Sequence, residues 1–148
     1  GAAISWTAGQ AYMSRRTHIP TQVPVRVGFC LLIAGVVLVS PVLWSEWPLW
    51  VTFLSWPVGG LGMGILFNPT TVAAMSYAEP GREGTVSGQT HFSDALGFSL
   101  MGGIGGATVA IADRTSFDLR AAIGLNFCLA IGCAVLGLVA SRGVRRAG

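Results

Sequence analysis

The amino-acid sequence predicts an all-α integral membrane protein, built as a polytopic helical bundle. Of its 148 residues, 52% are hydrophobic and 10% are charged, whereas roughly a quarter of the residues in a soluble domain are charged. The mean hydropathy is +0.64, and the apolar residues fall in long blocks. So few charges could not cover the surface of a water-soluble domain, and we therefore expect the chain to lie in a bilayer.

Four of the apolar blocks are long enough to cross a membrane, since about 18 to 25 residues span a ~30 Å hydrocarbon core. They must be helices, because the backbone has to satisfy its own hydrogen bonds in lipid. The expected spans are residues 27–44, 49–78, 85–112 and 121–141. Residues 1–13 read as the end of a preceding helix, and there is no initiator Met. We therefore expect residues 1–148 to be the C-terminal fragment of a longer protein whose N-terminal part is missing.

The charge of the connections alternates along the chain and predicts the topology. Connections 14–26 and 79–84 and the C-terminal tail hold seven Arg, whereas connections 45–48 and 113–120 hold two. The seven are Arg15, Arg16, Arg26, Arg82, Arg142, Arg145 and Arg146. Basic loops stay in the cytoplasm, so we expect the C-terminus there, in a multi-pass protein of the cell membrane. The proposed outer boundary carries an aromatic belt of Trp44, Trp47 and Trp50.

The second span is about 30 residues long, or ~45 Å as a straight helix, so it must tilt, kink or protrude. Pro57 and Pro69 favour kinks. Gly60 and Gly64 form a GxxxG pattern, which indicates either close packing of a neighbouring helix or a moving hinge. Asn68 precedes the second proline and is interpreted as a local backbone partner or a cavity-lining residue.

The third span divides into faces when its residues are placed at 100° intervals. Small residues share one face and would let another helix approach closely; they are Gly88, Ala95, Ser99, Gly102, Gly106 and Ala110. A second face is aliphatic. The third face combines polar and large apolar residues: Ser87, His91, Asp94, Phe98, Met101 and Gly105. Phe98 and Met101 are therefore candidates for lining a cavity.

Asp94 is the main candidate for proton or substrate handling. It lies nine residues after Thr85, hence ~13 Å along the helix. A carboxylate at such a depth is costly unless it is paired, protonated or facing water. A carboxyl that can change protonation state suits a proton-coupled carrier, and His91, one turn away, could share the proton. The alternative is a structural polar contact with a neighbouring helix.

The sequence offers no pattern for covalent chemistry. Cys30, Cys128 and Cys133 lie inside apolar runs without metal-ligand spacing, so we interpret them as small packing residues. A Walker A motif, which would indicate an ATP-driven cycle, does not occur. We expect no enzyme activity, no cofactor and no nucleic-acid partner.

Several motifs resemble the closing helices of major facilitator superfamily transporters. The resemblance rests on GGLGMGILFNPTTVAAMSYAEPGREGTVSGQ (59–89) and ALGFSLMGGIGGA (95–107). The cytoplasmic P-x-R-x-G-x-x-S-G motif of that family is matched by Pro80, Arg82, Gly84, Ser87 and Gly88. GQAYMSRRTHIP (9–20) resembles the second-half copy of the signature loop, with Gly9, Arg15 and Arg16 but without the acidic residue.

The resemblance implies the last four transmembrane helices, and the end of a fifth, of the C-terminal half of a major facilitator fold. It implies a secondary active transporter working by alternating access, similar to bacterial drug:proton antiporters that export small amphipathic molecules. Its partners would be that substrate, protons, the lipid bilayer and the rest of the chain. A facilitator-type uptake carrier for a metabolite and a non-transporting membrane scaffold remain alternatives.

Overall fold

The chain is all-helical in the residues that the computed structural model describes, which are 1–16, 18–43 and 47–143. The α-helices are α1 (Ala2–Ser14), α2 (Gln22–Val39), α3 (Trp50–Ser76), α4 (Glu83–Arg114) and α5 (Leu119–Ala140). Two short 3-10 helices, η1 (Ser40–Leu43) and η2 (Ser141–Gly143), extend α2 and α5. The predicted helical fold class is therefore confirmed at this level.

Four of these helices are long and apolar enough to cross a membrane. The candidate spans are Gln22–Leu43, Trp50–Ser76, Glu83–Arg114 and Leu119–Gly143. They correspond to the four blocks expected from hydropathy, and they support a multi-pass membrane protein. At 32 residues, α4 measures about 48 Å, which is longer than the ~30 Å core.

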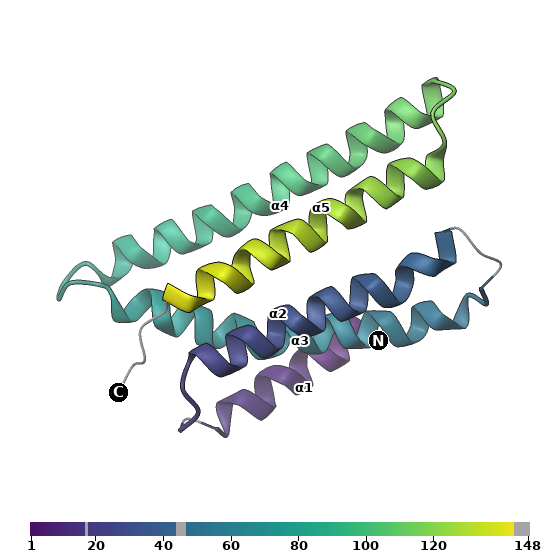
Figure 1. The fold of residues 1–148 in the computed structure, drawn as a ribbon. Helices are drawn as coiled ribbons and strands as arrows, with labels where there is room; N and C mark the ends of the chain where they lie inside the picture. Colours follow the sequence, from purple (N-terminus) through teal and green to yellow (C-terminus); the bar gives the residue numbers. More distant parts are fainter. Residues whose placement is uncertain (17, 44–46, 144–148) are drawn as a thin grey trace.

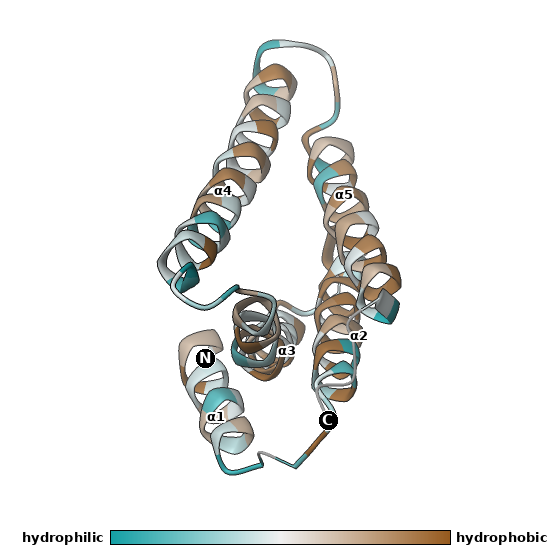
Figure 2. Cartoon of the chain, turned by 90° about the vertical axis from the view of Figure 1, so that its left-hand side faces the viewer, coloured by the Kyte–Doolittle hydropathy of each residue, from teal (hydrophilic) through white to brown (hydrophobic). Residues whose placement is uncertain are grey.

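The helices are packed unevenly (Figures 1 and 2). The α3 helix lies between α1 and α2, α5 packs on α2, and α4 runs along α5 at the outside of the bundle. Val25 of α2 and Leu66 of α3 are 3% and 7% exposed, and the most extensive helix contact is the one between α2 and α3. In Figure 2, α4 and α5 are joined by their loop and diverge from it.

Glycines allow α3 to approach both α1 and α2 closely. A Cβ atom at Gly28 of α2 would lie 2.7 Å from the carbonyl oxygen of Gly62 in α3. A Cβ atom at Gly9 of α1 would lie 3.0 Å from the carbonyl oxygen of Leu61 in α3. Backbones can come this close only where side chains are missing, so α3 is held on both sides by glycine contacts.

Proline positions explain where the helices depart from the expected spans. The α2 helix begins at Gln22 rather than near residue 27, because Pro24 falls in its first turn, where backbone N–H groups have no intrahelical partner. The α-helix ends at Val39 and Pro41 lies in η1, since proline cannot donate within an α-helix. Trp44 and Glu46, at the expected end of this span and in the next loop, lie outside the described residues.

The α3 helix is continuous through both of its prolines. The predicted span 49–78 is shortened to Trp50–Ser76, and α4 exceeds the predicted 85–112 by two residues at each end. Hydroxyl groups bond back to helix carbonyls beside Pro69: Thr70 and Thr71 donate to Leu66 and Phe67 at 2.7 and 3.0 Å. Such bonds commonly accompany helix bending.

The turn between α3 and α4 is compact. The N–H of Arg82 donates to the carbonyl of Glu79 at 2.9 Å, with Pro80 and Gly81 at the central positions. Gly81 has φ of +86°, a conformation that L side chains rarely adopt, and this pair of residues is typical of a type II turn. The turn sets the direction of α4, and hence of the candidate site.

Candidate functional site

The candidate proton-handling residues lie on the outermost helix. His91, Asp94 and Phe98 of α4 are exposed, and Met101 is half-buried. Among the described residues, neither His91 nor Asp94 forms a side-chain hydrogen bond or an ion pair. The two side chains share a helix face as predicted from their spacing, but they are not bonded to each other.

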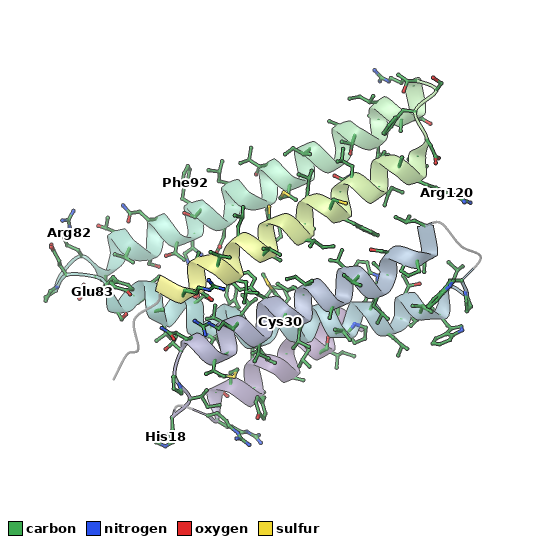
Figure 3. All side chains as sticks on the ribbon, viewed as in Figure 1. His18, Cys30, Arg82, Glu83, Phe92 and Arg120 are labelled. Carbon is green, nitrogen blue, oxygen red and sulfur yellow. The ribbon has the colours of Figure 1, made fainter. Side chains whose placement is uncertain are left out.

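This face of α4 is turned toward α5 at one end. The amide Nδ2 of Asn126 in α5 donates to Oγ1 of Thr108 in α4 at 2.7 Å. A Cβ atom at Gly105, which belongs to the same face as Asp94, would lie 3.7 Å from Oδ1 of Asn126. On the other side of α4, Phe92 points away from α5 (Figure 3). Asp94 therefore lies on the side of α4 that continues the α5 contact.

Asn126 and Thr108 were missed by the sequence reasoning. Asn126 also donates to the carbonyl of Ala122 at 3.1 Å, and the amide is half-buried. A single amide inside the apolar stretch of residues 121–141 was a usable signal, because a polar side chain in a membrane helix tends to find a partner on a neighbouring helix.

Asn68 and Arg16 are brought to a second, separate place. They line one groove of about 450 Å³ near the start of α2 and the end of α1. The groove also contains Met13, Ser14, Ile19, Thr21, Pro24, Pro69, Thr71 and Val72. Its lining belongs to α1, α2, α3 and the connection between α1 and α2, so Asn68 does not share a site with Asp94 on α4.

The candidate packing glycines divide into two groups. A Cβ atom at Gly60 would overlap the carbonyl oxygen of Ala2, and one at Gly64 would overlap that of Trp6. These glycines therefore hold α1 against α3. A Cβ atom at Gly102 or Gly106 would meet no described atom within 4 Å, so the helix expected on that stripe stays a prediction.

The candidate loop arginines lie at helix ends. Arg15 caps α1, and the guanidinium of Arg16 lies 5.0 Å from the ring centre of Tyr12, a cation–π contact. Arg82 lies 3.5 Å from the Glu79 carboxylate, at the turn where it is labelled beside Glu83 in Figure 3. Both Arg82 and Glu79 are mostly exposed, so this pair contributes little stability.

Exposed aromatics gather at the end of the molecule where α3 begins. Trp47 and Trp50 are 50% and 59% exposed, and Phe53 and Trp56 follow them at 79% and 65%. Large exposed aromatics at a helix end fit a membrane interface. Trp44, Arg145 and Arg146, which entered the predicted topology, lie outside the described residues.

The three cysteines are free and exposed, rather than packed in the interior as their apolar context predicted. Cys30 lies on α2, and Cys128 and Cys133 lie on α5, which packs against both α2 and α4. No group of three or more metal-ligating side chains occurs within residues 1–16, 18–43 and 47–143.

Comparisons of the chain with protein-family models, curated proteins and solved structures found no match. The resemblance to the major facilitator superfamily therefore rests on the motifs in residues 9–20, 59–89 and 95–107. It stays a prediction, whereas the helical fold and the four candidate spans are observed.

Proposed function

We propose that this chain forms part of a secondary active transporter of the major facilitator type. Its cycle exports small amphipathic molecules in exchange for protons by alternating access. The four candidate spans supply one wall of a helical bundle, and the rest of the chain supplies the others. The C-terminus and the loops with Arg15, Arg16 and Arg82 face the cytoplasm. No cofactor and no nucleic acid take part.

The observation that supports this proposal most is the position of Asp94. It lies eleven residues into α4, about 16 Å from the helix start, on the side that continues the α5 contact. A charged group at this depth is tolerated when it faces protein or a water-filled cavity, and such groups commonly serve proton or substrate pathways. Among the described residues, Asp94 has no salt-bridge partner.

Residues beside Asp94 suit an amphipathic substrate. Phe98 is 73% exposed on the same face, and Met101 follows it. An aromatic ring and a thioether provide apolar contact, whereas the carboxylate favours a positive charge. His91, one turn before Asp94, is a second group able to carry a proton near neutral pH.

Flux measurements on the reconstituted protein test the proposal. An imposed proton gradient should drive a fluorescent amphipathic cation across the vesicle membrane, and a protonophore should abolish this movement. A facilitator-type carrier would instead move its substrate equally well after the gradient is collapsed. A membrane scaffold would show no flux above empty vesicles, and either outcome would contradict the proposal.

A further inference from the structure

The polar face of α4 belongs to a longer repeating seam. Eight of its residues follow one another at alternating steps of four and three: Ser87, His91, Asp94, Phe98, Met101, Gly105, Thr108 and Ala112. A spacing that averages 3.5 residues keeps side chains on one side of a helix and suits packing at a shallow angle against a second helix. The seam extends through most of α4.

Only the C-terminal half of this seam is engaged. Ala112 is 6% exposed, Thr108 is bonded to Asn126, and Met101 is half-buried. From Phe98 back to His91 the same seam has no neighbour among the described residues: His91 and Asp94 are exposed, and Phe98 is 73% exposed. Ser87, beside the turn from α3, is half-buried again.

The α5 helix carries a matching seam. Its residues also alternate in steps of four and three: Ala122, Asn126, Leu129, Cys133, Leu136 and Ala140. Ala122 is fully buried at 0% exposure, whereas Leu136 is 70% exposed. The seam positions of both helices therefore become exposed in the same direction, away from the loop that joins them, in agreement with the divergence in Figure 2. The same end of α5 packs against α2 on a neighbouring face, where a Cβ atom at Gly137 would meet the ring of Phe29.

The register of the engaged half defines the partners in the open half. Thr108 pairs with Asn126, and the helices are antiparallel. Each step back along α4 therefore corresponds to an equal step forward along α5. Continuing the register places Phe98 opposite Leu136 and Asp94 opposite Ala140. The first pair would bury two large apolar side chains, but the second would bury a carboxylate against a methyl group.

We propose that the α4–α5 seam closes as far as Asp94 in a second conformation, and that the negative charge of Asp94 keeps it open. Joining Phe98 to Leu136 adds packing contacts between two apolar side chains. Closure also desolvates an ionised carboxylate that Ala140 cannot pair, which is unfavourable. Neutralising Asp94 removes this penalty. In the proposed transporter, binding of a proton to Asp94 would therefore allow α4 and α5 to close on each other. In this respect the inference rests on the proposed function.

Other charged or titratable groups share this part of the molecule. Within the described residues they include His91, Cys133, Arg142, Glu79, Arg82 and Glu83. Arg26 of α2 also belongs to them, because it precedes by one turn Phe29, whose ring a Cβ atom at Gly137 of α5 would meet. His91 is on the seam itself, one turn before Asp94. The glutamates and Arg82 stand at the turn before α4, and Arg142 follows α5 in η2.

Disulfide cross-linking tests the inference. Phe98→Cys and Leu136→Cys are combined in the full protein, in native membranes, after Cys30, Cys128 and Cys133 are replaced by Ala. Adding Asp94→Asn should raise the rate of cross-linking at least about threefold through a population shift. Asp94→Ala should raise it similarly because it also removes the charge, which provides a second measurement if the Asp94→Asn protein folds poorly. All rates are measured at one fixed pH with the same added thiol oxidant, because the thiolate is the reactive form and its amount changes with pH.

Matched variants separate closure from general mobility. Ala112→Cys with Ala122→Cys should cross-link under all conditions, because that end is engaged. The pair Leu96→Cys and Leu136→Cys should not cross-link under any of these conditions, because Leu96 lies on the opposite side of α4. Ser93→Ala, beside Asp94 but off the seam, should leave the rate unchanged. The inference is wrong if Phe98→Cys and Leu136→Cys do no better than the Leu96→Cys pair, or if neither Asp94→Asn nor Asp94→Ala raises the rate of cross-linking. Cross-linking is measured without substrate, so a protein that does not transport could still show the predicted closure. The test therefore distinguishes failure of this inference from failure of the proposed function.

Discussion

Asn126 of α5 donates a hydrogen bond from Nδ2 to Oγ1 of Thr108 in α4 at 2.7 Å. In the part of the chain that the structure describes, α4 otherwise has few neighbours, and most of its residues are exposed. The bond therefore positions the helix that carries Asp94. In a membrane neither the amide nor the hydroxyl can turn to bulk water, so losing one partner leaves the other unpaired.

A double-mutant cycle should detect this bond directly. Thr108→Val and Asn126→Leu should each lower stability, and the double variant should lose less than the sum. The expected coupling energy is about 0.6 kcal/mol, with an upper value of ~1.7 kcal/mol, as for other hydrogen bonds between membrane helices. Unfolding of the purified protein in mixed detergent provides the measurement. Strictly additive losses would mean that the two side chains do not interact.

Glycine packing between α1 and α3 gives a second prediction. Gly64→Ala should lower stability by about 1–3 kcal/mol, because its Cβ would overlap the Trp6 carbonyl and lie 3.1 Å from Cα of Gly9. The contacting atoms are backbone and cannot rotate away. The measurement is the melting temperature in detergent.

Gly59→Ala is the matched control on the same helix. A Cβ atom there meets nothing within 4 Å, and alanine is the better helix former by up to ~1 kcal/mol. This variant should be neutral or slightly more stable. If both variants were equally unstable, the effect would come from loss of flexibility in α3, and the hinge interpretation of Gly60 and Gly64 would gain support.

The sequence was sufficient for the number and approximate place of the long helices, because hydropathy over about 20 residues is a strong signal in membrane proteins. The residues at which these helices begin and end are determined by the positions of prolines. Pro24 is tolerated in the first turn of α2, so that helix starts before the apolar block, and Pro41 converts its end to a 3-10 helix. Hydropathy alone does not register either effect.

The candidate site was predicted only in part. The spacing of His91, Asp94 and Phe98 correctly placed them on one face of a helix, since 100° per residue holds along α4. Which face meets which neighbour depends on tertiary packing, so the sequence did not reveal the contact from Asn126 to Thr108. For the same reason the sequence analysis placed Asn68 in one group with Phe98 and Met101 of α4. In the structure Asn68 lines a different groove, together with Arg16.

The topology predicts opposite labelling of two loops. In a protein without Cys30, Cys128 and Cys133, Ser116→Cys should react with an impermeant thiol reagent added to intact cells. Arg146→Cys should react only after permeabilisation, because the Arg-rich ends stay in the cytoplasm. Position 116 is exposed in the structure, so access should not limit the reaction. The reverse pattern would invert the assignment of inside and outside.

His91→Gln distinguishes a tuning role from an essential one. Glutamine retains hydrogen bonding but carries no charge, so it removes one titratable neighbour of Asp94. We expect proton-driven flux to fall by about two- to fivefold, with a displaced pH profile, while substrate binding persists. Flux should be measured per folded molecule. Unchanged flux at every pH would remove His91 from the proton pathway.

The most direct test of the central claim is proton-driven flux through Asp94→Asn. The amide keeps the size of the side chain and most of its hydrogen bonds but cannot release a proton. Flux per folded molecule, measured from about pH 5.5 to about pH 8.5, should fall at least about tenfold, as the loss of a coupling free energy requires. Substrate binding and exchange should persist. Full, pH-dependent coupling in folded Asp94→Asn would contradict the account and leave Asp94 as a structural contact.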